Sequence, residues 1–182
     1  MAKKALIVLA DGFEEIEAIA PFDILKRAGV DVTLAGLSSR EIKSARGAKF
    51  VTEKTLNDTE SDFDAVILPG GSGGADNLSR SGRLKTLILS MIKDGKLVAA
   101  ICASPAAVLG PFGVLKGKKA TCYPGMEKEF PGDVRYSDAP VVVDGNVITG
   151  MGPAAAVAFG FKLAEMLAGA EKTESVKKAM LF

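Results

Sequence analysis

The chain has no histidine among its 182 residues, so it lacks the side chain that most often activates a catalytic nucleophile. A protease built on a Cys–His pair is therefore disfavoured. Any nucleophile in this chain needs a carboxylate, a helix dipole or backbone donors to replace imidazole.

Net charge and cysteine are also scarce. The 23 Lys and Arg residues against 22 Asp and Glu leave a net charge of +1, which gives no electrostatic reason to expect nucleic acid or an acidic membrane as a partner. Two cysteines, Cys102 and Cys122, do not form the disulfide framework of a secreted protein. The first apolar run, residues 5–10, is too short to span a membrane and leads into acidic residues instead of a cleavage site. We expect a cytoplasmic protein without membrane contact.

Composition and length predict one globular domain over residues 1–182, with 48% hydrophobic and 25% charged residues. Apolar runs of strand length alternate with helix-length segments, which favours an α/β fold with a mostly parallel sheet covered on both faces. The predicted strands are residues 5–10, 31–35, 65–68 and 97–101, a hairpin covers 141–149, and the predicted helices are 14–28, 84–93 and 153–167.

Cys102 ends the apolar run 97–101 and is followed at once by small, helix-starting residues. The thiol is therefore expected where a parallel strand meets a helix, the place where open α/β sheets hold ligands. There the N–H groups of Ala103 and Ser104 and the helix dipole would favour the thiolate. The alternative is a small buried core cysteine, which is common.

Glu17 lies in an acidic segment that begins a predicted helix directly after the first strand. This segment is therefore expected at the same edge of the sheet as Cys102. Apolar residues surround it, and Pro21 lacks the N–H that would bond its carbonyl. Burial would raise the pKa of Glu17 and let it share one proton with Cys102. For Glu14 and Glu15, a favourable interaction with the helix dipole is a sufficient explanation.

A glycine-rich segment, residues 70–74, follows the strand 65–68 and reaches the same edge. Glycines allow backbone N–H groups to converge on an oxyanion. A phosphate loop is disfavoured because the Lys-Ser/Thr ending and the dinucleotide spacing are missing, and a plain flexible turn stays open. Core packing explains Cys122 better than chemistry does.

Together, the motifs Ala10-Asp-Gly-Phe-Glu-Glu-Ile-Glu17, Leu68-Pro-Gly-Gly71, Ala100-Ile-Cys-Ala-Ser-Pro105 and Gly152-Pro153 resemble the ThiJ/PfpI family. The similarity is greatest to the branch of the Parkinsonism-associated redox protein DJ-one and its bacterial relatives. It implies a flavodoxin-like three-layer sandwich, a homodimer, and no cofactor or metal.

The resemblance also implies roles for individual residues. Cys102 matches the reactive cysteine, Glu17 the protonated glutamate beside it, and Gly70, Gly71 and Ala103 the donors of an oxyanion pocket. The remaining matches line the pocket or the dimer interface: Arg46, which looks like the arginine that reaches across the dimer, Gly152, Pro153 and Tyr123. Tyr123 departs from the family, since many members carry a histidine there, and activity that needs this histidine, including a glutaminase-type triad, does not carry over.

The function implied is glutathione-independent conversion of methylglyoxal or glyoxal to lactate or glycolate, with removal of early glycation adducts from proteins. Cys102 would form a hemithioacetal and Glu17 would move a proton between the two carbons through an enediolate. Two alternatives use the same residues. One is a redox sensor or stress-linked chaperone whose Cys102 is oxidised to sulfinate. The other is a small-molecule binding module that needs no reactive thiol.

Overall fold

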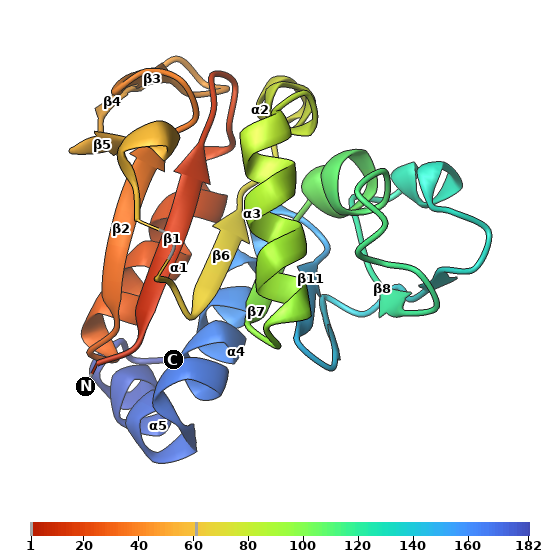
Figure 1. The fold of residues 1–182 in the computed structure, drawn as a ribbon. Coiled ribbons are helices and arrows are strands. Elements are labelled where there is room, and N and C mark those ends of the chain that lie inside the picture. Colours follow the sequence, from red (N-terminus) through yellow and green to blue (C-terminus); the bar gives the residue numbers. More distant parts are fainter. Residues whose placement is uncertain (1, 61) are drawn as a thin grey trace.

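The structure is a computed structural model that describes residues 2–60 and 62–182. Its centre is a seven-stranded sheet with the order β10-β11-β7-β6-β1-β2-β5. The paired strands are parallel except β10 and β11, which form an antiparallel hairpin. Helices cover both faces of this sheet (Figure 1). The architecture confirms the predicted α/β flavodoxin-like sandwich.

The structure gives the following bounds. The sheet consists of β1 (Lys4–Leu9), β2 (Asp31–Gly36), β5 (Lys54–Thr55), β6 (Ala65–Leu68), β7 (Leu97–Ile101), β10 (Val141–Asp144) and β11 (Val147–Gly150). Two small sheets pair β3 (Glu41–Lys43) with β4 (Lys49–Val51) and β8 (Lys119–Ala120) with β9 (Arg135–Tyr136). The α-helices are α1 (Glu15–Arg27), α2 (Ser72–Ser79), α3 (Gly82–Lys93), α4 (Ala156–Ala168) and α5 (Ala170–Ala179).

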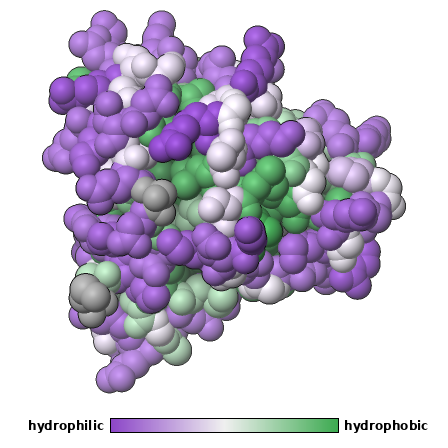
Figure 2. Space-filling model, viewed as in Figure 1, coloured by the Kyte–Doolittle hydropathy of each residue, from purple (hydrophilic) through white to green (hydrophobic). Residues whose placement is uncertain are grey.

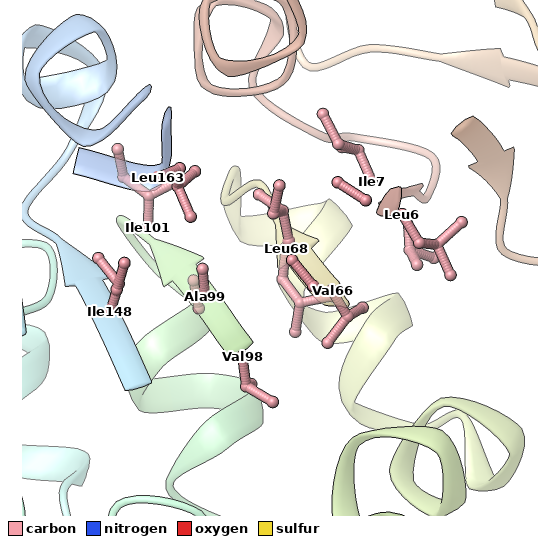
Figure 3. Packing of buried hydrophobic residues seen from close by; sticks show 14 of the residues in the cluster. Leu6, Ile7, Val66, Leu68, Val98, Ala99, Ile101, Ile148 and Leu163 are labelled. Carbon is pink, nitrogen blue, oxygen red and sulfur yellow. The ribbon is translucent and has the colours of Figure 1, made fainter. Parts of the chain in front are cut away.

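The central strands are apolar at consecutive positions because both of their faces are covered. Every residue of β6 and β7 is buried, as strands between two helical layers require. Figure 3 shows their side chains within the core, with Leu163 of α4 close to Ile101 at the end of β7. The predicted bounds of β6 and β7 are confirmed to the residue, those of β1 are displaced by one residue at both ends, and β2 is one residue longer than predicted.

Helix α1 is held against α4 by a close backbone approach. A Cβ atom added to Gly160 of α4 would lie 3.2 Å from the Cα atom of Pro21 and 2.7 Å from Cδ1 of Ile24. Glycine therefore lets the two helices meet where α1 contains its proline. Gly29, with φ 81°, follows the C-terminal end of α1 as predicted. This packing fixes α1 with its first turn at the carboxyl edge of the sheet.

Several elements differ from the sequence predictions. The glycine-rich segment is not a flexible turn, because α2 begins at Ser72 directly after Gly71. The chain after Cys102 forms a short π-helix, Pro105–Leu109, where a regular helix was expected. The expected helix 153–167 begins as a 3-10 turn, Pro153–Ala155, and α5 was not predicted. In the predicted hairpin, the tight turn takes its positive φ from Gly145 alone.

The order of the strands places three loops at one edge. The chain runs from β1 to β2 in one direction and from β6 to β7 in the other, so α1 lies on one face and α3 on the opposite face (Figure 1). Ligands bind beyond the carboxyl ends of the strands where such a reversal occurs. The segments that follow β1, β6 and β7 meet there.

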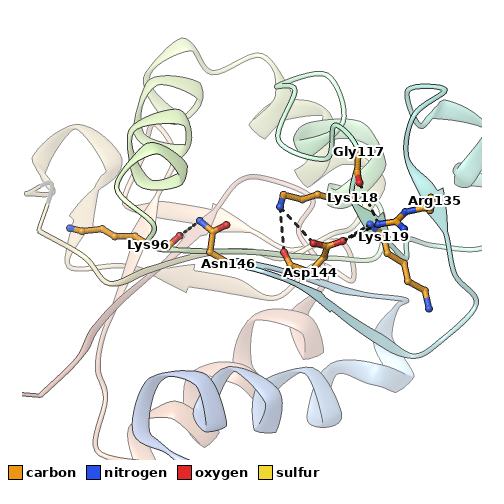
Figure 4. Close-up of polar contacts among 7 residues, drawn as sticks. All are labelled: Lys96, Gly117, Lys118, Lys119, Arg135, Asp144 and Asn146. Atoms are coloured by element: carbon orange, nitrogen blue, oxygen red, sulfur yellow. Dashed lines mark hydrogen bonds and ion pairs between the residues drawn. The ribbon is translucent and has the colours of Figure 1, made fainter.

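A long excursion between β7 and β10 is tied back to the sheet by Asp144. Its carboxylate accepts a hydrogen bond from the N–H of Lys119 at 2.8 Å and pairs with Lys118 at 3.8 Å and Arg135 at 3.7 Å. Figure 4 shows these contacts around the end of β10, where Asn146 also donates to the carbonyl of Lys96. This cluster anchors the small β8–β9 sheet to the hairpin.

The outer surface in the view of Figure 2 is mostly hydrophilic, with hydrophobic side chains gathered in the middle of that face. Among the helices of residues 2–60 and 62–182, none has the length and apolar character needed to cross a bilayer.

Candidate active site

Cys102 occupies a strained turn at the end of β7. Its φ angle is 65°, a left-handed conformation that residues other than glycine rarely adopt. The turn is held on both sides, because the Cys102 N–H donates to the carbonyl of Gly150 at 2.9 Å and its carbonyl accepts from the N–H of Tyr123 at 2.8 Å. The residue is 7% exposed. Such a turn is typical of a nucleophile lifted to the edge of an α/β sheet.

Glu17 brings a buried carboxyl group to the same place. It lies in the first turn of α1 and is fully buried. Its Oε2 atom accepts a hydrogen bond from the N–H of Gly70 at 2.7 Å. A Cβ atom added to Gly70 would lie 2.8 Å from this oxygen and 2.6 Å from Cβ of Cys102, so the two side chains flank the same glycine. The other oxygen, Oε1, is buried without a hydrogen-bond partner. The predicted proximity of Glu17 and Cys102 is confirmed.

Burial dominates the electrostatics of this pair. Desolvation raises the pKa of Glu17 to about 7, against the opposing hydrogen bond from Gly70. Burial and the negative charge of Glu17 raise the pKa of Cys102 to about 12, although the N–H groups of Gly71 and Ala103 oppose this. The direction for Glu17 is the predicted one. The direction for Cys102 is opposite to the expectation of a stabilised thiolate, because burial and the Glu17 charge outweigh the N–H groups of Gly71 and Ala103.

At pH values between about 7 and about 12, the pair therefore holds one proton. A thiolate beside a protonated Glu17 and a thiol beside an ionised Glu17 contain the same number of protons. In the second form the carboxylate is a base placed to take the thiol proton as the sulfur attacks. A carboxylate in this position can take the part that a histidine takes in other nucleophilic sites.

The backbone N–H groups around Cys102 and Glu17 have two different partners. The N–H groups of Gly71 and Ala103 face the sulfur and are placed to stabilise negative charge that develops beside it. Gly70 was expected among the oxyanion donors, but its N–H is directed at Glu17 instead. The expected direction of the Ser104 N–H stays a prediction, and the hydroxyl group of this residue donates to the carbonyl of Pro69.

The position of Gly71 leaves no room for a side chain. Its φ angle is 82°, and an added Cβ would lie 2.3 Å from the carbonyl oxygen of Gly12 and 2.8 Å from the amide nitrogen of Glu14. The loop after β1 therefore packs directly on the loop after β6. Sequence reasoning missed this role of Gly12, because two glycines 59 positions apart give no sign that they are in contact.

We expect Gly71→Ala to lower the free energy of unfolding by about 2–4 kcal/mol, since it combines left-handed strain with overpacking against backbone. Urea denaturation measures this. The matched control is Gly29→Ala, because Gly29 has φ 81° with no atom within 4 Å of the added Cβ. That control should lose only about 1 kcal/mol. Equal losses in the two variants would show that the contact with Gly12 does not matter.

The remaining predicted residues lie around this centre. Tyr123 is 49% exposed, and an added Cβ on Gly152 would be 3.5 Å from its ring. Both residues, with Pro153, line a largely apolar groove of about 300 Å³. Arg46 lies on the turn between β3 and β4, highly exposed, with its guanidinium 3.6 Å from Glu14 of the same chain. Its predicted reach across a dimer stays a prediction.

Comparison with known proteins identifies the family to which this chain is similar. The model of the DJ-1/PfpI family matches residues 3–166. The chain is 44% identical to Protein dj-1beta of Drosophila melanogaster over 100% of this chain and 98% of that protein. It is 38% identical to the glutathione-independent glyoxalase DJR-1.2 of Caenorhabditis elegans over 98% and 96%.

A solved structure gives the same result for the fold. The crystal structure of Drosophila melanogaster DJ-1beta superposes with a TM-score of 0.96 at 43% identity and covers 100% of this chain and 98% of that one. A buried glutamate and a strained cysteine at the switch point therefore sit in a fold that this chain shares over its whole length with that protein. The chain belongs to the DJ-1/PfpI family.

Proposed function

We propose that this protein is a cysteine-dependent, cofactor-free glyoxalase that converts methylglyoxal or glyoxal to lactate or glycolate without glutathione. The observation that carries the proposal is that Cys102 and the buried carboxyl group of Glu17 flank the same glycine: a Cβ atom added to Gly70 would lie 2.6 Å from Cβ of Cys102 and 2.8 Å from Oε2 of Glu17. A relative that is named as a glutathione-independent glyoxalase supports the same reaction class. Removal of early glycation adducts from proteins would use the same attack on a carbonyl carbon.

The first step forms the carbon–sulfur bond. The Cys102 sulfur attacks the aldehyde carbon while its proton passes to the Glu17 carboxylate. The oxyanion that develops is stabilised by the N–H groups of Gly71 and Ala103. Glu17 then returns the proton to this oxygen, which gives a neutral hemithioacetal and restores the carboxylate.

The later steps move two protons and add one water. Glu17 removes the proton from the former aldehyde carbon to give an enediolate and delivers it to the neighbouring carbon. The hydroxyl proton on the first carbon passes to the oxygen of the second, which leaves a thioester. Water then hydrolyses the thioester, releasing lactate and the free Cys102. The sum of the steps is methylglyoxal plus water to lactic acid. General acid–base help from one carboxyl group contributes about 10²–10⁴-fold, so modest turnover is expected.

The direct test is lactate formation from methylglyoxal without glutathione, compared between the wild type and Cys102→Ser. Wild-type protein that forms no lactate would exclude the proposal.

A redox function is favoured by one further observation, the buried Oε1 atom of Glu17, which has no hydrogen-bond partner. Two equivalents of peroxide oxidise a thiol first to sulfenic and then to sulfinic acid, with one water released in each step. A protonated Glu17 can donate a hydrogen bond to the sulfinate. After mild peroxide treatment, mass spectrometry should find two added oxygen atoms on Cys102 and none on the fully buried Cys122. Oxidation of Cys122 with Cys102 still reduced would contradict this function.

Homodimer formation is part of the proposal. Its support is an apolar surface near Arg46: Ile16 and Ile19 on α1 are 46% and 36% exposed, and Val51 on β4 is 73% exposed. The turn between β3 and β4 is tied to α1, since Glu15 accepts hydrogen bonds from the Ser44 hydroxyl and the Arg46 N–H.

Both cysteines are free, which supports the expected cytoplasmic location.

A further inference from the structure

Ser104 makes a buried contact that links two loops of the site. It lies two residues after Cys102, is fully buried, and its hydroxyl donates a hydrogen bond to the carbonyl of Pro69 at 2.6 Å. The pairing between β6 and β7 ends at Leu68 and Ala100. The Ser104 contact therefore joins the loop after β6 to the turn after β7 beyond the last pair of the sheet.

The loop that Ser104 holds carries two of the donors of the site. The Gly70 N–H donates to Glu17, and the Gly71 N–H faces the sulfur of Cys102. On the other side of this loop, the Gly70 carbonyl accepts a hydrogen bond from the N–H of Glu14 at 3.1 Å. The loop is thus attached both to the start of α1 and to the turn that carries the nucleophile.

We propose that Ser104 is a positioning residue that sets the distance between the Cys102 sulfur and the donors on Gly70 and Gly71. An N–H group stabilises a negative sulfur or oxygen only at hydrogen-bonding distance and with good alignment. Without the hydroxyl, the Pro69 carbonyl loses its partner and the loop is free to move away from Cys102. The same contact would hold the oxyanion donor for the hemithioacetal, and only this part of the inference rests on the proposed function.

The test measures the thiol itself and not turnover. The rate of Cys102 alkylation by iodoacetamide is followed across neutral and alkaline pH, with peptide mass spectrometry to separate Cys102 from Cys122. In Ser104→Ala we expect the loss of a positioned N–H group to raise the pKa of the thiol further, so that Cys102 reacts more slowly at every neutral and moderately alkaline pH. Alkylation should slow by about three- to tenfold, because a smaller thiolate fraction outweighs its greater nucleophilicity.

The control removes a similar hydrogen bond far from the site. Thr173 on α5 is buried, and its hydroxyl donates to the carbonyl of Gly169 at 2.9 Å. Thr173→Ala should lower stability without changing the alkylation profile. A profile in Ser104→Ala that matches the wild type would overturn the proposal and leave Ser104 a purely structural residue.

Ser104→Thr keeps the hydroxyl and should keep the wild-type profile, which would support the proposal even if Ser104→Ala fails to fold. A Thr variant with the slow alkylation expected of the Ala variant would overturn it. Absence of lactate formation in the wild type would exclude the glyoxalase reaction and leave this result unaffected, because alkylation requires no turnover.

Discussion

Cys102→Ser should reduce lactate formation from methylglyoxal by roughly 10³-fold or more. A serine hydroxyl has a much higher pKa than a thiol, so a carboxylate with a pKa of about 7 cannot take its proton effectively. The covalent hemithioacetal then does not form, although the donors on Gly71 and Ala103 stay in place. The measurement is lactate produced over time at saturating methylglyoxal, without glutathione.

The matched control is Cys122→Ala, which removes the second, fully buried thiol. It should keep the wild-type rate in the folded protein, with stability checked by thermal denaturation. If Cys102→Ser turned over methylglyoxal at the normal rate, the proposed covalent mechanism would be wrong. If only Cys122→Ala lost activity, the assignment of the nucleophile would be wrong.

Glu17→Gln is the second change with a large expected effect on activity. Glutamine has nearly the same shape and can still accept the hydrogen bond from Gly70, but it can take no proton from the thiol or from carbon. Turnover should fall by about 10²–10⁴-fold. In the wild type, lactate formation should rise with pH through about 7 as Glu17 ionises. That rising limb should be missing in Glu17→Gln.

The same substitution has a thermodynamic consequence with a defined sign. The folded-state pKa of Glu17 is raised from 4.5 to about 7, so the folded protein keeps a proton that the unfolded chain releases. This stabilisation is fully present below pH 4.5 and is lost as the pH rises through 7, a change of about 3 kcal/mol. The stability of the wild type relative to Glu17→Gln should fall by that amount over this range.

Urea denaturation at several pH values measures this difference. Glu171→Gln is the control, because it removes one carboxylate from the exposed surface of α5. Its stability should follow that of the wild type at every pH. A constant difference between the wild type and Glu17→Gln from acid to neutral pH would mean that Glu17 ionises normally in the folded protein.

Much of this site could be predicted from local sequence. The runs that became β6 and β7 are apolar at consecutive positions and end at Pro69 and Cys102, so strand type, bounds and the position of the thiol followed directly. Glu17 stood out because its neighbours are apolar and Pro21 interrupts the helix after it. Its burial and the direction of its pKa shift agree with that prediction.

Elements whose stability comes from distant contacts were missed. The two- and three-residue strands β3, β4, β5, β8 and β9 have too few residues for a periodic pattern. Strands β5, β8 and β9 form because partners elsewhere along the chain complete their hydrogen bonds, as Asp144 does for the β8 region, whereas β3 and β4 pair with each other across a short turn. Helix α2 was hidden behind glycines that favour a loop when read without their tertiary neighbours.

The sequence alone determined the alternation of the longer strands with α1, α3 and α4, the sheet edge at which Cys102 and Glu17 lie, and the need for a base other than histidine. These follow from apolar periodicity and residue chemistry, which are local properties. Only the tertiary structure decided that the Gly70 N–H serves Glu17, that Ser104 bonds to Pro69, and that the thiol is buried enough for its pKa to rise. The physical reason is that donor direction and desolvation depend on atoms brought together by folding, and no local pattern records them.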